Sequence, residues 1–187
     1  MAGRYFQKAR WRPFSNKGML YRLEHLDEFE LTVTDTGGIL RRIAVTFGDY
    51  CFTRAALAHD PEFVYPDSDR RPGHFCFDRY NLSHGLPRHI ATATHGKVWT
   101  VAGDNYAAVP VVDHTGKEIV YRIVFSLDPV KGLPVALHMR VKTAYPADAT
   151  PFVTFGSVRF IHLVALRMQN KRPGRIVDQR RKSPRVS

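Results

Sequence analysis

The sequence has little cysteine and no long apolar run. Two cysteines in 187 residues, Cys51 and Cys76, cannot form the disulfide framework of a small secreted domain, and they predict reduced thiols in a cytoplasmic protein. The longest apolar stretches, such as 106–112, have the length of a strand and fall short of the roughly 18 residues of a membrane span. No apolar segment follows the basic start, so we expect neither a secretory signal nor a membrane partner.

Motifs that hold cofactors and metals are also missing. The sequence contains no Gly-x-Gly-x-x-Gly and no Gly-x-Ser-x-Gly, and Thr115-Gly116-Lys117 matches only the end of a phosphate loop. Nine histidines are present, but none forms a His-x-His or His-x-x-x-His pair. His74 and Cys76 could supply two zinc ligands, and no Cys-x-x-Cys completes the set. We therefore expect no cofactor and no metal.

What the sequence does have is an excess of basic residues at both ends. Its 28 lysines and arginines against 17 acidic residues give a net charge of +11. Residues 1–18 carry five basic and no acidic residues, and 170–187 carry seven basic and one acidic, whereas 19–169 is neutral. The pattern predicts one domain over 19–169 between a basic N-terminal arm, 1–18, and a basic C-terminal tail, 170–187, with both termini leaning toward disorder.

Hydrophobic periodicity predicts an α+β fold, a mostly antiparallel β-sheet (a meander) with one or two short helices. The expected strands are 28–34, 39–47, 97–102, 106–112, 118–127 and 135–145. A helical turn is expected at 55–59, a surface loop at 60–73, and a helix from Asn81 or Ser83, or from Pro87, to Thr94. Segment 152–167 fits either a helix or a strand, and its β-branched and aromatic content favours a strand over 158–166.

The basic ends point to nucleic acid, with RNA favoured. Cationic arms release counterions from a polyanion, and aromatic residues between the cations suit stacking on unpaired bases. The candidate nucleic-acid-binding residues are Arg4, Lys8, Arg10, Trp11, Arg12, Arg79, Lys142, Arg180, Arg181 and Lys182. A solvated tail that keeps the protein soluble, or a transit peptide, would also account for this composition.

The side chains of the strand expected over 135–145 suggest a catalytic site. His138, Arg140 and Lys142 alternate and should project from one face, with Thr143 and Tyr145 following. Cleavage of RNA without metal requires a base for the 2′-hydroxyl proton, an acid for the leaving oxygen and cations for the phosphate charge. A plain polar stripe on the solvent side of the strand is the alternative interpretation.

The segment Lys142-Thr143-Ala144-Tyr145-Pro146, after the turn 128–132, resembles the end of small toxin ribonucleases. That superfamily joins barnase, the RelE-type messenger-RNA endonucleases and the colicin-type transfer-RNA nucleases. The resemblance implies N-terminal helices, a four-stranded antiparallel sheet and metal-independent cleavage. It would place Arg140, Thr143 and Tyr145 in the site, with His138 nearby. This chain departs from the pattern because a hairpin is expected first.

The leading hypothesis is therefore a metal-independent endoribonuclease of toxin type. In it His138 or Tyr145 is the general acid or base, Arg140 and Arg54 bind the phosphate, and Thr143 orients it. One alternative is a non-catalytic nucleic-acid-binding or host-modulating protein from a mobile element. Another is a protein-interaction module, whose partner would be an antitoxin or an enzyme with an acidic groove.

Overall fold

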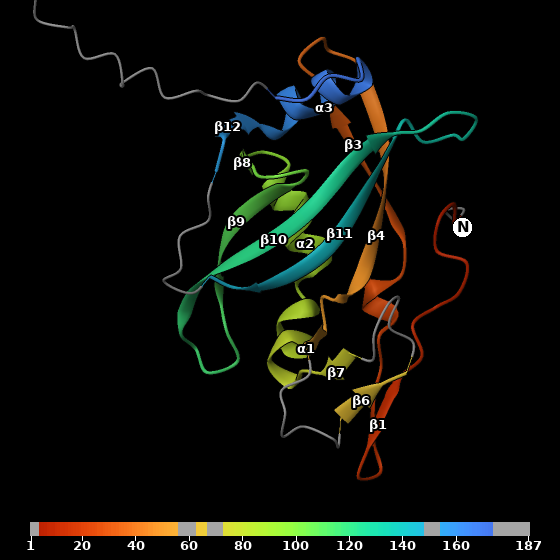
Figure 1. The fold of residues 1–187 in the computed structure, drawn as a ribbon, viewed down its shortest axis with the longest axis vertical. Helices are drawn as coiled ribbons and strands as arrows, with labels where there is room; N and C mark the ends of the chain where they lie inside the picture. Colours follow the sequence, from red (N-terminus) through yellow and green to blue (C-terminus); the bar gives the residue numbers. More distant parts are fainter. Residues whose placement is uncertain (1–3, 56–62, 67–72, 148–153, 174–187) are drawn as a thin grey trace, which may run out of the picture.

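The computed structural model describes residues 4–55, 63–66, 73–147 and 154–173 (Figure 1). Its strands are β1 (Phe14–Asn16), β2 (Met19–Tyr21), β3 (Phe29–Thr34), β4 (Leu40–Tyr50), β5 (Thr53–Arg54), β6 (Val64–Tyr65), β7 (Gly73–Phe75), β8 (Lys97–Thr100), β9 (Asn105–Val112), β10 (Glu118–Pro129), β11 (Leu137–Pro146) and β12 (Gly156–Arg159). Its helices are the 3₁₀ turn η1 (Glu24–Leu26), α1 (Phe77–Ser83), α2 (Leu86–Ala93) and α3 (Phe160–Met168). Among these helices none is both long and apolar enough to cross a membrane.

A curled seven-stranded sheet dominates the fold, in the order β12-β8-β9-β10-β11-β4-β3. Neighbouring strands are antiparallel except β4 and β11, which run parallel, with Ile43 opposite Leu137. The predicted α+β class with a mostly antiparallel sheet is confirmed, as are the hairpin β3–β4 and the meander from β8 to β11. The parallel contact that joins them was not predicted.

Local chemistry explains why these hairpins form. Asp35 directly follows β3, and its carboxylate accepts hydrogen bonds from the backbone amides of Gly37 and Ile39 at 2.8 and 3.1 Å. Gly38 takes φ 76°, a left-handed conformation that favours glycine. Asp113 caps the turn between β9 and β10 in the same way, with Gly116 at φ 83°. Both turns are thus specified by an aspartate and a glycine a few residues apart.

The core lies on one face of the sheet, beneath the helices. Tyr121, Ile123, Phe125 and Leu127 alternate along β10 and are all buried. In Figure 1, α2 lies behind β9 and β10, and α3 lies at the top of the sheet. The ring of Phe160 on α3 is 6.1 Å from that of Phe125. Burying each such side chain contributes about 1.5–3 kcal/mol to the stability of the fold. Because these residues must face the core, the opposite face of β10 and β11 is the outer face of the sheet.

The strand expected over 158–166 is wrong. Strand β12 ends at Arg159, and α3 follows it directly. Phe160, Leu163 and Val164 are buried at the i, i+3, i+4 spacing of one helix face. Packing of that face against β10 overrides the strand preference of the aromatic and β-branched residues, because such preferences depend on context.

The expected helix count and boundaries also need correction. The described residues contain three short α-helices where one or two were expected. The alternative helix start at Pro87 is confirmed, because α2 runs over Leu86–Ala93, and α1 is a separate helix before it that was not predicted. Gly85 lies between them, where a Cβ atom would stand 2.3 Å from Nε2 of His89, so a larger residue there would require the ring of His89 to move. Pro87 lies in the first turn of α2, where its missing amide costs no hydrogen bond.

The N-terminal arm differs from the expected one. Strand β1 pairs with β2, and residues 4–12 run along the body of the protein, as shown below. The C-terminal tail from 174 onward lies outside the described residues, as do residues 56–59 of the expected helical turn and most of the expected loop 60–73.

Candidate nucleic-acid interface

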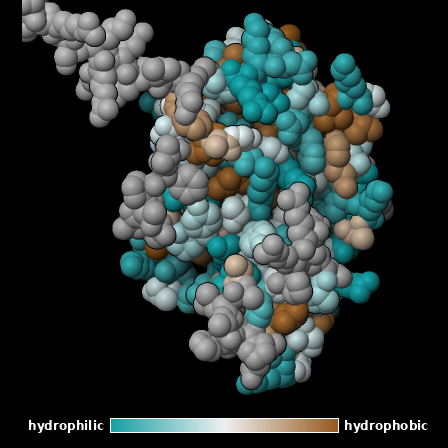
Figure 2. All heavy atoms as spheres, viewed as in Figure 1, coloured by the Kyte–Doolittle hydropathy of each residue, from teal (hydrophilic) through white to brown (hydrophobic). Residues whose placement is uncertain are grey.

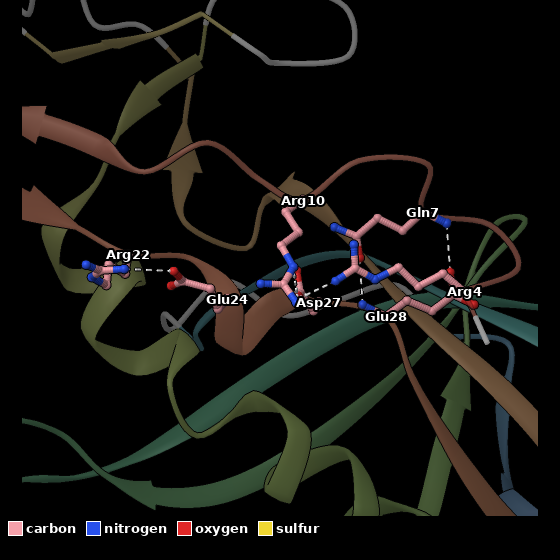
Figure 3. Close-up of polar contacts among 7 residues, drawn as sticks. All are labelled: Arg4, Gln7, Arg10, Arg22, Glu24, Asp27 and Glu28. Carbon is pink, nitrogen blue, oxygen red and sulfur yellow. Dashed lines mark hydrogen bonds and ion pairs between the residues drawn. The ribbon is translucent and has the colours of Figure 1, made fainter. Parts of the chain in front are cut away.

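The N-terminal strap, residues 4–12, is held at its beginning by Glu28. The carboxylate of Glu28 accepts hydrogen bonds from the backbone amides of Tyr5, Phe6 and Gln7 at 2.8, 2.9 and 2.7 Å. The side-chain oxygen of Gln7 in turn accepts from the amide of Glu28 at 2.6 Å (Figure 3). Hydrogen bonds to an ionised group are stronger than neutral ones, so this clamp determines the path of the strap.

Acidic residues beside β3 also pair with the arginines of the strap. The guanidinium groups of Arg4 and Arg10 both contact Oδ2 of Asp27, at 2.8 and 3.0 Å (Figure 3). The hydroxyl of Tyr5 donates to Glu30 at 3.1 Å. The exposed Arg10 thus spans from Asp27 toward the groove described below.

Phe6 covers His138 on the outer face of the sheet. The two rings are stacked with centroids 3.8 Å apart and an angle of 1° between their planes. A hydrogen bond of 2.7 Å joins Nε2 of His138 to the hydroxyl of Thr46. Burial lowers the pKa of His138, and the charge of Arg140 lowers it further, against the opposing effects of Glu28 and Asp128. His138 is therefore neutral near pH 7.

The far end of the strap is anchored in the core. The ring of Trp11 meets that of Phe52 edge to face at 5.3 Å and lies 6.4 Å from that of Tyr65. The hydroxyl of Tyr65 donates to the carbonyl oxygen of Arg12 at 2.8 Å. Because both ends are fixed, residues 8–10 are held as a bridge alongside the sheet.

A basic groove of about 590 Å³ lies between this bridge and the outer face of β4 and β11. It is lined by Phe6, Gln7, Lys8, Ala9, Arg10, Trp11, Arg12, Thr46, Phe47, His138 and Arg140. Four of these residues are lysine or arginine, and none of the described lining residues is acidic. The groove thus unites His138 and Arg140 of the predicted catalytic set with four predicted nucleic-acid-binding residues: Lys8, Arg10, Trp11 and Arg12.

A β-bulge in β11 changes which side chains share this face. His138 and Arg140 lie opposite Asp128 and Ser126 of β10, whereas Thr143 and Tyr145 lie opposite Val124 and Arg122. Those β10 partners alternate, so they project from one side. Strict alternation would have sent Thr143 and Tyr145 to the core face. The bulge adds Lys142 and restores them to the outer face.

Arg79 of α1 fixes the far end of this face. Its Nη1 donates to the carbonyl oxygens of Tyr50 and Thr53 at 2.8 and 2.9 Å and to Oγ1 of Thr143 at 3.3 Å. Its guanidinium lies 5.5 Å from the ring centre of Tyr145. These contacts bring Arg79, Thr143 and Tyr145 into one group.

The same face carries an aromatic row that the sequence analysis missed. The guanidinium of Arg122 lies 5.9 Å from the ring of Tyr145 and 5.7 Å from that of Tyr106. Tyr106 stacks on Trp99 at 5.1 Å with 11° between the planes. Knowing which strands are neighbours would have revealed the row, since Trp99 and Tyr106 are cross-strand partners. Figure 2 shows hydrophobic side chains exposed between hydrophilic ones on the face turned toward the viewer.

The predicted catalytic residues do not form one constellation. Seven strand positions separate His138 from Tyr145, a span of roughly 20 Å, so both cannot act on one phosphate. Arg54 lies on β5 in a separate three-stranded sheet, opposite His74, and its Nη1 donates to the carbonyl of Ala55 at 3.5 Å. Lys142 forms an ion pair of 2.6 Å with Asp104. The candidates Arg180, Arg181 and Lys182 lie outside the described residues.

The described residues hold no cluster that could bind a metal ion, and the thiol of Cys51 is inert. No group of three or more histidine, cysteine, aspartate or glutamate side chains there could hold a metal ion. Burial raises the pKa of Cys51 to about 12, so its thiol stays protonated and unreactive at neutral pH.

Comparison with known proteins places the chain in a family. The model of the YjaZ family matches residues 13–167, which include the whole seven-stranded sheet and begin just after the strap. No curated protein and no solved structure matches.

Proposed function

We propose that this chain, which belongs to the YjaZ family, binds nucleic acid through the basic groove, with RNA as the favoured ligand. The observation that carries the proposal is the lining of the groove, to which Lys8, Arg10, Arg12 and Arg140 contribute and which contains no acidic residue, while Arg10 also pairs with Asp27 beside the groove. Converging cations of this kind suit a phosphate backbone, and an arginine guanidinium can bind two phosphate oxygens at once.

The salt dependence of binding follows from the number of cations. Each phosphate neutralised on a single strand adds about 0.7 to the slope of log affinity against log salt. Four contacts give a slope near 3, so affinity should fall roughly 50-fold between 50 and 200 mM salt. A protein that binds a neutral partner would show no such loss.

The test is the affinity of the full chain for a labelled RNA across a salt series. Replacing Lys8 and Arg140 by Gln should weaken binding and lower the slope by about 1.4. Replacing Lys117 by Gln is the matched control, because Lys117 is exposed in the β9–β10 turn, outside the groove. An unchanged slope in the double variant contradicts the proposal. Tight association with a protein that survives nuclease treatment would favour the protein-interaction module instead.

Metal-independent cleavage is a second candidate, favoured by the group at the far end of β11. There Thr143, Tyr145 and Arg79 hold a hydroxyl, a phenol and a guanidinium together. In this reaction the 2′-hydroxyl attacks phosphorus, the bond to the 5′ oxygen breaks, a base takes one proton and an acid supplies the other. Total RNA incubated in EDTA should then be cut by the native chain and not by Tyr145→Phe. Intact RNA that shifts on a gel would leave binding alone.

A further inference from the structure

We propose that the aromatic row, defined as Trp99, Tyr106, Arg122, Tyr145 and Arg79, is a stacking platform for the bases of a single-stranded nucleic acid. The row spans four adjacent strands, β8 to β11, and ends on α1. Neighbouring members of the row lie 5.1–5.9 Å apart, measured between rings or from guanidinium carbon to ring centre. The inference rests on the proposed function and names its substrate class.

The row lies on the side of the sheet away from the described helices α2 and α3. Arg122 alternates along β10 with Tyr121 and Ile123, which are buried in the core. His89 of α2 lies against Tyr121, with ring centroids 6.0 Å apart. Trp99, Arg122 and Tyr145 are partly exposed, so part of each of these side chains reaches the protein surface. Tyr106 is buried and stacks on Trp99, which it supports from within the row.

The planar rings and guanidinium groups of the row indicate which class of ligand would bind there. Every base has a π face that stacks on an aromatic ring or a guanidinium plane, and stacking of this kind is tolerant of sequence. The cations of the row match the charge of a phosphate backbone. A duplex already stacks its bases on each other and cannot offer their faces, so a single strand is the ligand that fits.

Position links the platform to the basic groove. Arg140 lines the groove and Tyr145 belongs to the row, and both project from the outer face of β11 because of the bulge at Lys142. Five strand positions between them correspond to roughly 15 Å. A single strand of a few nucleotides can therefore place its phosphates in the groove and its bases on the row.

The experiment separates stacking from charge with three probes of equal length: a single-stranded RNA, an abasic strand with the same phosphates, and an RNA duplex. The native chain should bind the single strand more tightly than the abasic strand, by about 5- to 150-fold for each stacked base. Trp99→Leu should reduce that ratio, and Trp99→Phe, which keeps a ring, should retain most of it. Binding of the single strand should also quench tryptophan fluorescence in the native chain, and the part of that quenching due to Trp99 should be absent in Trp99→Leu.

Each outcome decides between the two proposals. The groove variant with Lys8 and Arg140 replaced by Gln should weaken binding of intact and abasic strands alike and leave their ratio unchanged. Equal binding of intact and abasic strands by the native chain, or preference for the duplex, overturns the platform and leaves the groove standing. Arg122→Gln is the second variant if a thermal melt shows that Trp99→Leu is destabilised. Failure of the native chain to bind any probe overturns both proposals.

Discussion

Replacing Glu28 by Gln should release the N-terminal strap without unfolding the sheet. One carboxylate oxygen accepts the amide of Tyr5, and the other accepts those of Phe6 and Gln7. A glutamine keeps one acceptor oxygen and presents an amino group to the remaining amides, so at least one bond is lost. Hydrogen bonds to charged groups contribute about 1.5–3 kcal/mol each, compared with about 1 kcal/mol for neutral ones.

These magnitudes predict that the free energy for opening the strap falls by about 2–4 kcal/mol. Because 1.4 kcal/mol corresponds to a factor of ten, hydrogen exchange at the amides of residues 5–7 should accelerate by roughly 30- to 1,000-fold. Glu118→Gln, at an exposed position that starts β10, is the matched control and should leave that exchange unchanged. Unaltered protection of residues 5–7 in Glu28→Gln would refute the idea that this carboxylate holds the strap.

Three further predictions concern buried groups. Phe6→Ala should raise the pKa of His138 toward its ordinary value, because burial is the main cause of the lowered pKa. NMR titration of the His138 ring would measure the change. An unchanged pKa would argue that the strap does not shield the ring. Tyr121→Phe should stabilise the fold by about 1 kcal/mol in urea unfolding, because the buried hydroxyl has no hydrogen-bond partner among the described residues. Marked destabilisation would reveal a partner. Burial, reinforced by His84, lowers the pKa of His25 to about 4, so the unfolded chain binds the proton first as the pH falls from about 6.5 to 4. After allowance for solvent screening, the free energy of unfolding should drop by about 1–2 kcal/mol across that range, and His25→Asn should flatten the dependence in urea titrations at pH 7 and 4.5.

The parts of the fold that the sequence predicts well are local. Strand alternation and the Asp35 and Asp113 turns lie within a few residues of the strands that they connect, so reading along the chain finds both hairpins. Helix α3 was missed because short apolar runs carry weak periodicity, and only its packing against Phe125 decides between helix and strand.

The candidate site was predictable in its residue types and not in its grouping. Charge alone selected Lys8, Arg10 and Arg12, and strand alternation selected Arg140. Their meeting depends on the clamp at Glu28, a residue whose sequence context shows only an acidic position at the start of a strand. The bulge in β11 likewise arises from pairing with β10 and leaves no local signal, so the distance between His138 and Tyr145 could not be judged beforehand.

The parallel contact between β4 and β11 has a consequence for folding kinetics. It brings together residues far apart in the chain, such as Thr46 and His138, which are 92 positions apart. Contacts of this range require a large loop to close and form slowly, whereas the β3–β4 hairpin and the β8–β11 meander can form from neighbouring residues. The groove takes one wall from each of these halves. We therefore expect the groove, and with it the proposed binding of RNA, to form during refolding only in the slowest phase, after most strand content has formed.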